Sequence, residues 1–233
     1  MSSSKDYEII QLNIKTAFLH GPIDEEIYME QPEGFGDGPE YVWKLQKALY
    51  GLKQVAQAFY LQLRGVLKSI GFTQCETNHA VFHQCNGDKI VIILAHIDNM
   101  PLIGTPLSFL KDIKSKMGNE FDLVHLGGPK MFVRVKINRD QATGPIKISQ
   151  GQYVKDILKW FEMSDCKPCD MPMAELPNLP KLDTPTIDCT LYQRGIGSLM
   201  YAMVQTHANL AYSTGLLAQH SANPGKEHWS AFK

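Results

Sequence analysis

A histidine and an aspartate alternate at one point of the chain, where His96, Ile97 and Asp98 follow an aliphatic run. On a β-strand, side chains two residues apart lie on the same face, so the imidazole and the carboxylate would be neighbours. Such a pair can act as an acid–base couple, in which the carboxylate orients the ring that transfers the proton. The alternative interpretation, which we favour, is that the histidine only fills space.

Four side chains that zinc accepts stand close together at Cys75, His79, His83 and Cys85. Their spacing fits no common zinc module, and a loop that enters a strand turns alternate side chains to opposite faces. A CxxC string that ends at Cys169 lacks the second cysteine pair of an all-cysteine zinc site and the strand-to-helix context of a redox motif. We therefore expect free thiols and no bound zinc.

Hydrophobic periodicity indicates the elements that would position these residues. Alternation predicts a strand within 8–18 and an extended piece at 27–29, and an Asn-Gly-Asp turn at 86–88 predicts a hairpin. This turn would join strands at 80–82 and 89–97. Further strands are expected over 100–103, 132–137 and 146–149. Helical spacing predicts a helix of about 15 residues after Gly51, and others over 106–117, 152–161 and 191–220. This order, with antiparallel hairpins, indicates an α+β fold.

Composition excludes several classes of protein. The chain has 233 residues, of which 44% are hydrophobic, so it can bury a substantial core. Its 23 basic and 24 acidic residues give a net charge of −1, so nucleic-acid binding would need a local patch. The longest aliphatic run, 90–95, is far shorter than the roughly 20 residues that span a bilayer. Residues 1–5 do not resemble a secretory signal, and we expect an intracellular protein.

Six longer strings carry the most specific signal in the sequence. They are QLNIKTAFLHG (11–21), EEIYMEQPEGF (25–35), KALYGLKQ (47–54), IILAHIDNM (92–100), ISQGQYVKDIL (148–158) and GSLMYAM (197–203). In their order and spacing, which cover nearly the whole chain, they resemble the reverse transcriptases of copia-type LTR retrotransposons.

The resemblance implies a right-hand polymerase fold, in which an antiparallel palm sheet with helices on one face precedes a thumb and a helical connection. We expect a palm-like subdomain over 1–140, a thumb-like segment over 141–163, a Pro-rich linker over 164–190 and a helical connection region over 191–233. The family's basic fingers segment and a complete RNase H domain are expected to be missing. An uncovered palm face would then favour self-association.

The resemblance also implies a catalytic centre with three carboxylates that hold two Mg²⁺ ions. The three positions here are Asn13, Asp98 and Asn99, so two of the three are amides. An amide carries no charge, and one unit charge pair at 4 Å contributes roughly 4 kcal/mol at an effective dielectric of 20. We therefore expect Asp98 to bind Mg²⁺ weakly at best, and we expect no polymerase activity. His96 occupies the place of the family's aromatic residue at the same turn.

Other matching positions concern ligand binding. Phe18 stands where the family places the aromatic residue that excludes a ribose 2′-hydroxyl, and a core aromatic is the alternative. Gln54 matches the glutamine that lies against the incoming nucleotide. The family's primer-grip strand corresponds to 131–137, with Arg134 in place of glycine. Two lysine groups would contact RNA or DNA phosphates, or form solvated helix surfaces; they are Lys44, Lys47 and Lys53, and Lys111, Lys114 and Lys116.

These observations predict a reverse-transcriptase-like, retrotransposon-derived protein that does not polymerise and that retains binding of a nucleic acid or nucleotide. Two alternatives stay open. One is a repurposed enzyme of another reaction class that uses a new pocket. The other is a relic of the element without a function.

Overall fold

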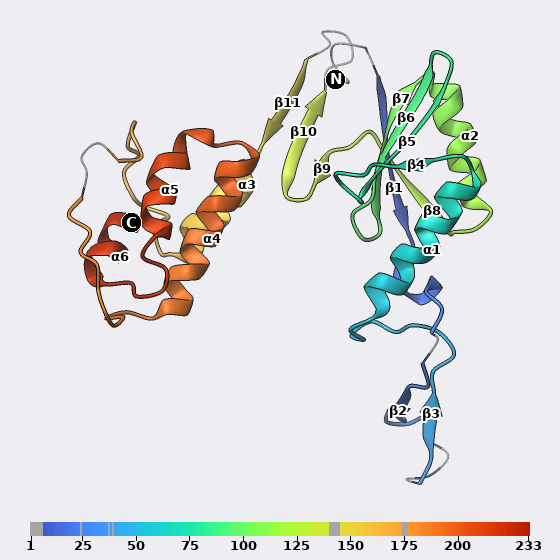
Figure 1. Ribbon diagram of the computed structural model, residues 1–233, viewed down its shortest axis with the longest axis horizontal. Coiled ribbons are helices and arrows are strands. Elements are labelled where there is room, and N and C mark those ends of the chain that lie inside the picture. Colours follow the sequence, from blue (N-terminus) through green and yellow to red (C-terminus); the bar gives the residue numbers. More distant parts are fainter. Residues whose placement is uncertain (1–6, 24, 37, 39, 140–144, 174–176) are drawn as a thin grey trace. The chain divides into compact units, whose positions relative to one another are not determined.

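The computed structural model describes residues 7–23, 25–36, 38, 40–139, 145–173 and 177–233. Contacts divide the chain into two compact units (Figure 1). The first comprises Met1–Pro129 and Gln141–Pro145, and the second comprises Lys130–Asp140 and Ile146–Lys233. The predicted boundary between the palm-like and thumb-like segments, at 140–141, lies outside the described residues.

A six-stranded sheet forms the frame of the first unit, in the order β4-β5-β6-β7-β1-β8. Every pair of neighbouring strands is antiparallel. The predicted turn at Gly87, which has a φ of 59°, joins β5 to β6 as expected. The strands are β1 (Glu8–Ile14), β4 (Thr73–Gln74), β5 (Val81–Asn86), β6 (Lys89–Leu94), β7 (Asn99–Thr105) and β8 (Leu123–Gly127).

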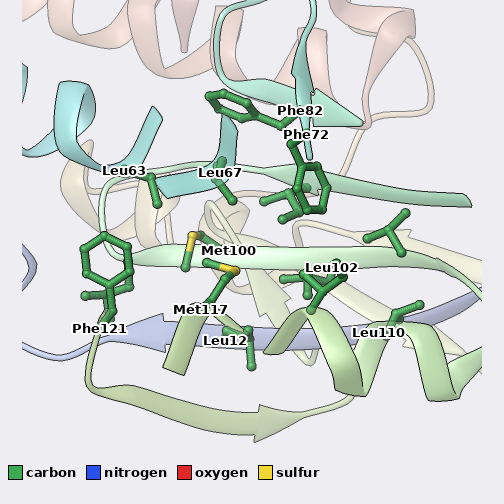
Figure 2. Packing of buried hydrophobic residues seen from close by; sticks show 14 of the residues in the cluster. Leu12, Leu63, Leu67, Phe72, Phe82, Met100, Leu102, Leu110, Met117 and Phe121 are labelled. Carbon is green, nitrogen blue, oxygen red and sulfur yellow. The ribbon is translucent and has the colours of Figure 1, made fainter. Parts of the chain in front are cut away.

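Two helices, α1 (Val55–Ser69) and α2 (Leu107–Gly118), pack on one face of this sheet. Figure 2 shows side chains of both helices and of the central strands in one apolar cluster. Its members are fully or almost fully buried; they include Leu12, Phe59, Leu63, Leu67, Met100, Leu102, Leu110 and Met117. The α+β class and the 15-residue helix after Gly51 are therefore confirmed.

A separate ribbon in the first unit pairs β2 (Tyr28–Glu30) with β3 (Val42–Lys44). Large apolar side chains on and beside this ribbon are exposed, and Phe35 retains 72% of its accessible surface. An exposed apolar patch favours association with another protein surface. Self-association through an uncovered palm face stays a prediction, and this ribbon is a further exposed apolar surface.

The second unit combines a small sheet with helices. Its sheet has the order β11-β10-β9, and all pairs are antiparallel. Among the described residues of 164–188 none lies in a helix or strand, whereas the last two residues of the predicted linker, 189–190, begin the helix α4 (Cys189–Gln205), and the linker stays a prediction. The elements are β9 (Met131–Phe132), β10 (Val135–Arg139), β11 (Ile146–Ser149), α3 (Gly151–Trp160), α4 (Cys189–Gln205), η2 (Ala208–Leu210), α5 (Ala211–Ala218) and α6 (Lys226–Phe232).

Several predicted elements differ from the structure, among them the strand expected over 89–97, which ends at Leu94. The strand expected within 8–18 ends at Ile14, because Thr16 adopts a φ of 48° and starts the short helix η1 (Ala17–His20). The strand expected over 132–137 is interrupted by Val133 and Arg134, whose φ values are 47° and 59°. The prediction of a single helix over 191–220 is also wrong, because α4, η2 and α5 occupy this range. The helical segment breaks at Thr206, whose hydroxyl donates a hydrogen bond to Gln150 Oε1 at 2.7 Å.

Tyr192 and His228 lie in the core of the second unit, and His220, which is half-buried, lies against His228. Tyr192 is fully buried and donates a hydrogen bond to the Leu217 carbonyl oxygen at 2.8 Å. Burial raises the pKa of this phenol to about 12. His228 is also fully buried, and its ring stacks on that of His220 with a centroid distance of 4.0 Å.

Replacing Gly104 by alanine should destabilise the sheet of the first unit. A Cβ atom at this position would collide with the backbone oxygen of Ile90 and lie 2.9 Å from the Cα of Val91. We expect a loss of about 2–4 kcal/mol in the free energy of opening, measured by hydrogen exchange of the β6 and β7 amides. Gly65→Ala is the control. It adds a Cβ in open space within α1 and should stabilise by about 0.5–1 kcal/mol.

The second unit should lose stability in mild acid. Burial, with smaller contributions from His228 and Lys181, lowers the pKa of His220 below 6.5. The unfolded chain therefore binds a proton more readily, so stability falls as the pH drops below about 6.5. Thermal unfolding followed by tryptophan fluorescence should show this loss, and His220→Gln should reduce it. An unchanged pH dependence in that variant would contradict the assignment.

Candidate functional site

The pairing of β1 with β7 brings the three predicted catalytic positions together. Asn13 stands directly opposite Asn99 in the antiparallel register, and Asp98 immediately precedes Asn99. The amide N–H of Ile14 donates to the Asp98 carbonyl oxygen at 2.8 Å, which fixes the turn against β1. Because Leu12 points into the core, its neighbour Asn13 lies on the opposite face, away from α1 and α2.

Two side-chain hydrogen bonds organise this cluster. Asn13 Nδ2 donates to Asp98 Oδ2 at 2.8 Å, and Gln11 Nε2 donates to Asn99 Oδ1 at 3.2 Å. The Asp98 carboxylate determines which way the Asn13 amide is turned, because the oxygen of that amide would be repelled by the carboxylate. Gln11 retains only 6% of its accessible surface and was not predicted. Its position two residues before Asn13, on the same strand face, was the available signal.

The turn between β6 and β7 is strained. Strand β6 ends at Leu94 rather than at 97, and the backbones of His96 and Asn99 form an isolated bridge around the turn. Ile97 has a φ of 56°, which is costly for a β-branched residue, on the order of 1–3 kcal/mol. His96 and Asp98 therefore flank a turn residue instead of sharing the face of a strand.

Phe18 and Gln54 line different cavities. Phe18, Phe59 and Ile97 help to line an apolar cavity of about 210 Å³. The Phe18 ring also packs edge-on against Phe59, with a centroid distance of 6.1 Å, so the core interpretation has support. Gln54 lines a second cavity of about 210 Å³ and donates a hydrogen bond to Glu25 at 3.0 Å. The structure does not bring Phe18 and Gln54 to one nucleotide-shaped pocket.

The predicted lysine groups are partly neutralised. Lys44 pairs with Glu26, and Lys116 pairs with Asp112 at 2.9 Å. Within the described ranges, the other four have no ion-pair partner; they are Lys47, Lys53, Lys111 and Lys114.

An aromatic and cationic cluster in the second unit was not predicted as such. The Arg134 guanidinium lies 5.8 Å from the ring centre of Tyr153 and 5.9 Å from that of Trp160. Arg194 lies 5.7 Å from the same Trp160 ring. Trp160 remains 41% exposed and both arginines are exposed, so the cluster presents aromatic surface and two positive charges to solvent. The substitution of glycine by Arg134 was the one signal for it in the sequence.

No group of three or more histidine, cysteine, aspartate or glutamate side chains that could hold a metal ion occurs in the described part of the chain. The cysteines in the described residues are free. A hydrogen bond with the Thr77 hydroxyl is the main cause that lowers the pKa of Cys75. None of the described helices has the length and apolar composition needed to cross a bilayer.

The donor set around Asp98 does not match a site for two Mg²⁺ ions. Paired Mg²⁺ ions require several anionic oxygens, and one carboxylate with two amides offers a single negative charge. The Asn13 amide also directs an N–H group, which repels cations, at one of the two carboxylate oxygens. No reaction step is therefore assigned to a metal here.

Comparison with known proteins agrees with the resemblance. Residues 1–175 match the family described as reverse transcriptase (RNA-dependent DNA polymerase). The chain is 35% identical to the retrovirus-related Pol polyprotein from transposon TNT 1-94 of Nicotiana tabacum, over 100% of this chain and 18% of that protein. It is 34% identical to the corresponding polyprotein from transposon RE1 of Arabidopsis thaliana, over 98% of this chain and 16% of that protein.

A shorter relative, a Ty5-1 transposon protein of Saccharomyces cerevisiae, is 27% identical over 93% of this chain and 71% of its own length. By contrast, the chain spans less than a fifth of the length of the Nicotiana and Arabidopsis polyproteins. The family match covers most of the chain, and the relatives are Pol polyproteins of transposons. The chain therefore belongs to the reverse transcriptase (RNA-dependent DNA polymerase) family, as a copia-type, retrotransposon Pol-derived protein.

Proposed function

We propose that this chain is a reverse-transcriptase-like palm and thumb that does not polymerise and that retains binding to nucleic acid. The antiparallel sheet with α1 and α2 on one face supports a palm in the first unit. The thumb-like segment would contain β11 and α3, and the Pro-rich linker would lead to the helical connection region of α4 to α6.

The hydrogen bond from Asn13 Nδ2 to Asp98 Oδ2 is the observation that carries the proposal of inactivity. In the family, the two corresponding side chains are both carboxylates that face shared metal ions. Here one of the two is the amide of Asn13, and it donates a hydrogen bond to an oxygen of Asp98 at 2.8 Å. A cation that used both oxygens of Asp98 would have to displace this bond, with only one negative charge to compensate for it.

The missing charges also set the expected loss of rate. Each absent carboxylate removes a charge pair of roughly 4 kcal/mol at 4 Å and an effective dielectric of 20, before the double charge of the ion is counted. About 1.4 kcal/mol corresponds to tenfold in rate, so two absent carboxylates cost over about a thousandfold even when most of each contribution is screened.

Restoring the acids should create cation binding. Asn13→Asp with Asn99→Asp places three carboxylates around one point, and we expect at least about tenfold tighter Mn²⁺ binding than in the wild-type chain. Without metal the same variant should lose stability through repulsion of like charges. Electron paramagnetic resonance of free Mn²⁺ measures the first effect, and thermal unfolding with and without Mn²⁺ measures the second.

Asn86→Asp with Asn119→Asp is the matched control, because it adds two charges at exposed positions of the same unit. It should leave Mn²⁺ binding unchanged. Tight binding of two Mn²⁺ ions by the wild-type chain would contradict the proposal. So would extension of a primed template in Mg²⁺ or Mn²⁺ that Asp98→Ala abolishes.

Nucleic-acid binding is proposed for the cluster of Arg134, Arg194 and Trp160. Arginine side chains neutralise phosphates, and an exposed aromatic ring offers a stacking surface for a base. Here both guanidinium groups lie within 6 Å of one half-exposed indole ring. Lys47 and Lys53, which have no ion-pair partner among the described residues, offer a second, smaller set of charges in the first unit.

Arg134→Gln with Arg194→Gln should weaken binding of a fluorescent RNA–DNA primer–template. We expect the slope of log affinity against log salt to fall in magnitude by about 1 for each lost phosphate contact. Fluorescence anisotropy at several salt concentrations measures both quantities. Lys68→Gln with Lys89→Gln removes the same charge from exposed positions elsewhere and serves as control. Salt-independent binding by the wild-type chain would rule out a phosphate-binding role.

A further inference from the structure

A groove of about 950 Å³ opens on the helix-covered side of the first unit. Helix α2 packs over β7 and β6, whereas β8 lies at the edge of the sheet, two places from β7. The groove lies over the part of β1 and β8 that α2 does not cover. Residues of α2, β1 and β8 line it. Its volume is within the range of roughly 300–1,000 Å³ that is typical of small-molecule sites.

The lining combines an apolar floor with positive charge. Ile10, Phe121 and Leu123 supply apolar surface from β1, from the segment after α2 and from β8. Lys111 and Lys114 stand three residues apart on α2, so they lie on the same helix surface, and both line the groove. Neither ammonium group is paired with a carboxylate among the described residues.

Other polar groups in the lining offset this charge only in part, because Glu8 adds one carboxylate to the groove. Ser115 and His125 add hydrogen-bonding side chains without a fixed charge. Two carboxylates, Glu8 and Asp122, also line the groove, but Asp122 is paired with Lys15 at 3.0 Å. An anion in the groove would therefore meet two available lysines.

The groove is separate from the cluster around Asp98. Ile10 lines the groove, and the side chains of Gln11 and Asn13 belong to the cluster on the other face of the sheet. A ligand here would not compete with one at Asp98. The apolar floor also favours a ligand with an apolar body, which a nucleic-acid backbone lacks.

We propose that this groove binds a small organic anion with an apolar body. Its carboxylate or phosphate head would lie between Lys111 and Lys114, and its apolar part would pack against Phe121 and Leu123. Selective binding of such an anion needs both the lysines and the apolar floor. The lysines alone are exposed to water, which weakens their attraction for an anion, and the apolar floor alone does not distinguish an anion from an uncharged ligand.

Three probes of equal chain length test this proposal by isothermal titration calorimetry below their aggregation limits. They are decanoate, decyl phosphate and uncharged decanol. We expect both anions to bind at least about tenfold more tightly than decanol, and the comparison of the two anions distinguishes a carboxylate from a phosphate ligand. Methyl NMR signals of Ile10, Leu107 and Leu123 should shift with either anion. Equal binding of decanol, or no binding of either anion, would overturn the proposal.

Two variants locate the site. Lys111→Glu with Lys114→Glu reverses the charge and should weaken anion binding at least about tenfold, whereas Lys68→Glu with Lys89→Glu, at exposed positions outside the groove, should leave it unchanged. Ser115→Trp fills the groove from an exposed helix position, keeps both lysines and should weaken binding to a similar extent. Thermal unfolding verifies that each variant is folded. Unchanged affinity in both groove variants would place the binding elsewhere and contradict the assignment.

Discussion

The antiparallel register of β1 and β7 is the constraint on which the cluster around Asp98 depends. It places Asn13 opposite Asn99 and holds Asp98 by the backbone bond from Ile14. The same register buries Leu12 against Met100, so hydrophobic packing and the geometry of the cluster are fixed together. A slip by one residue would bury Asn13 and expose Leu12, which makes the arrangement costly to change.

This frame holds the three positions together even though two of the side chains are amides. Core packing and the backbone hydrogen bonds of the sheet do not depend on whether positions 13 and 99 carry a carboxylate or an amide. Both side chains face away from α1 and α2. The strained Ile97 turn is likewise held by β6, β7 and β1. Loss of charge at a site and loss of the fold are therefore separable, and in the proposed account only the first has occurred.

Much of the fold follows from sequence patterns, and the exceptions have physical causes. Periodicity predicts α1 and the β5–β6 hairpin because local propensity and burial agree there. It misses the Val133–Arg134 turn, which tertiary contacts hold: the Tyr201 hydroxyl bonds the Val133 carbonyl oxygen, and Arg134 lies over Trp160. The resemblance identifies Asn13, Asp98 and Asn99 but not their hydrogen bonds, because those depend on side-chain orientation.

In the proposed function, the amide hydrogen bond from Asn13 to Asp98 takes the place of a site for paired cations. A crystal of this chain soaked with Mn²⁺ and a nucleoside triphosphate, measured at an energy where manganese scatters anomalously, tests it directly. We expect the bond from Asn13 to Asp98, 2.8 Å long, to stay intact and no pair of anomalous peaks to lie beside it. Two manganese peaks about 4 Å apart at Asp98, with the triphosphate attached, would contradict it.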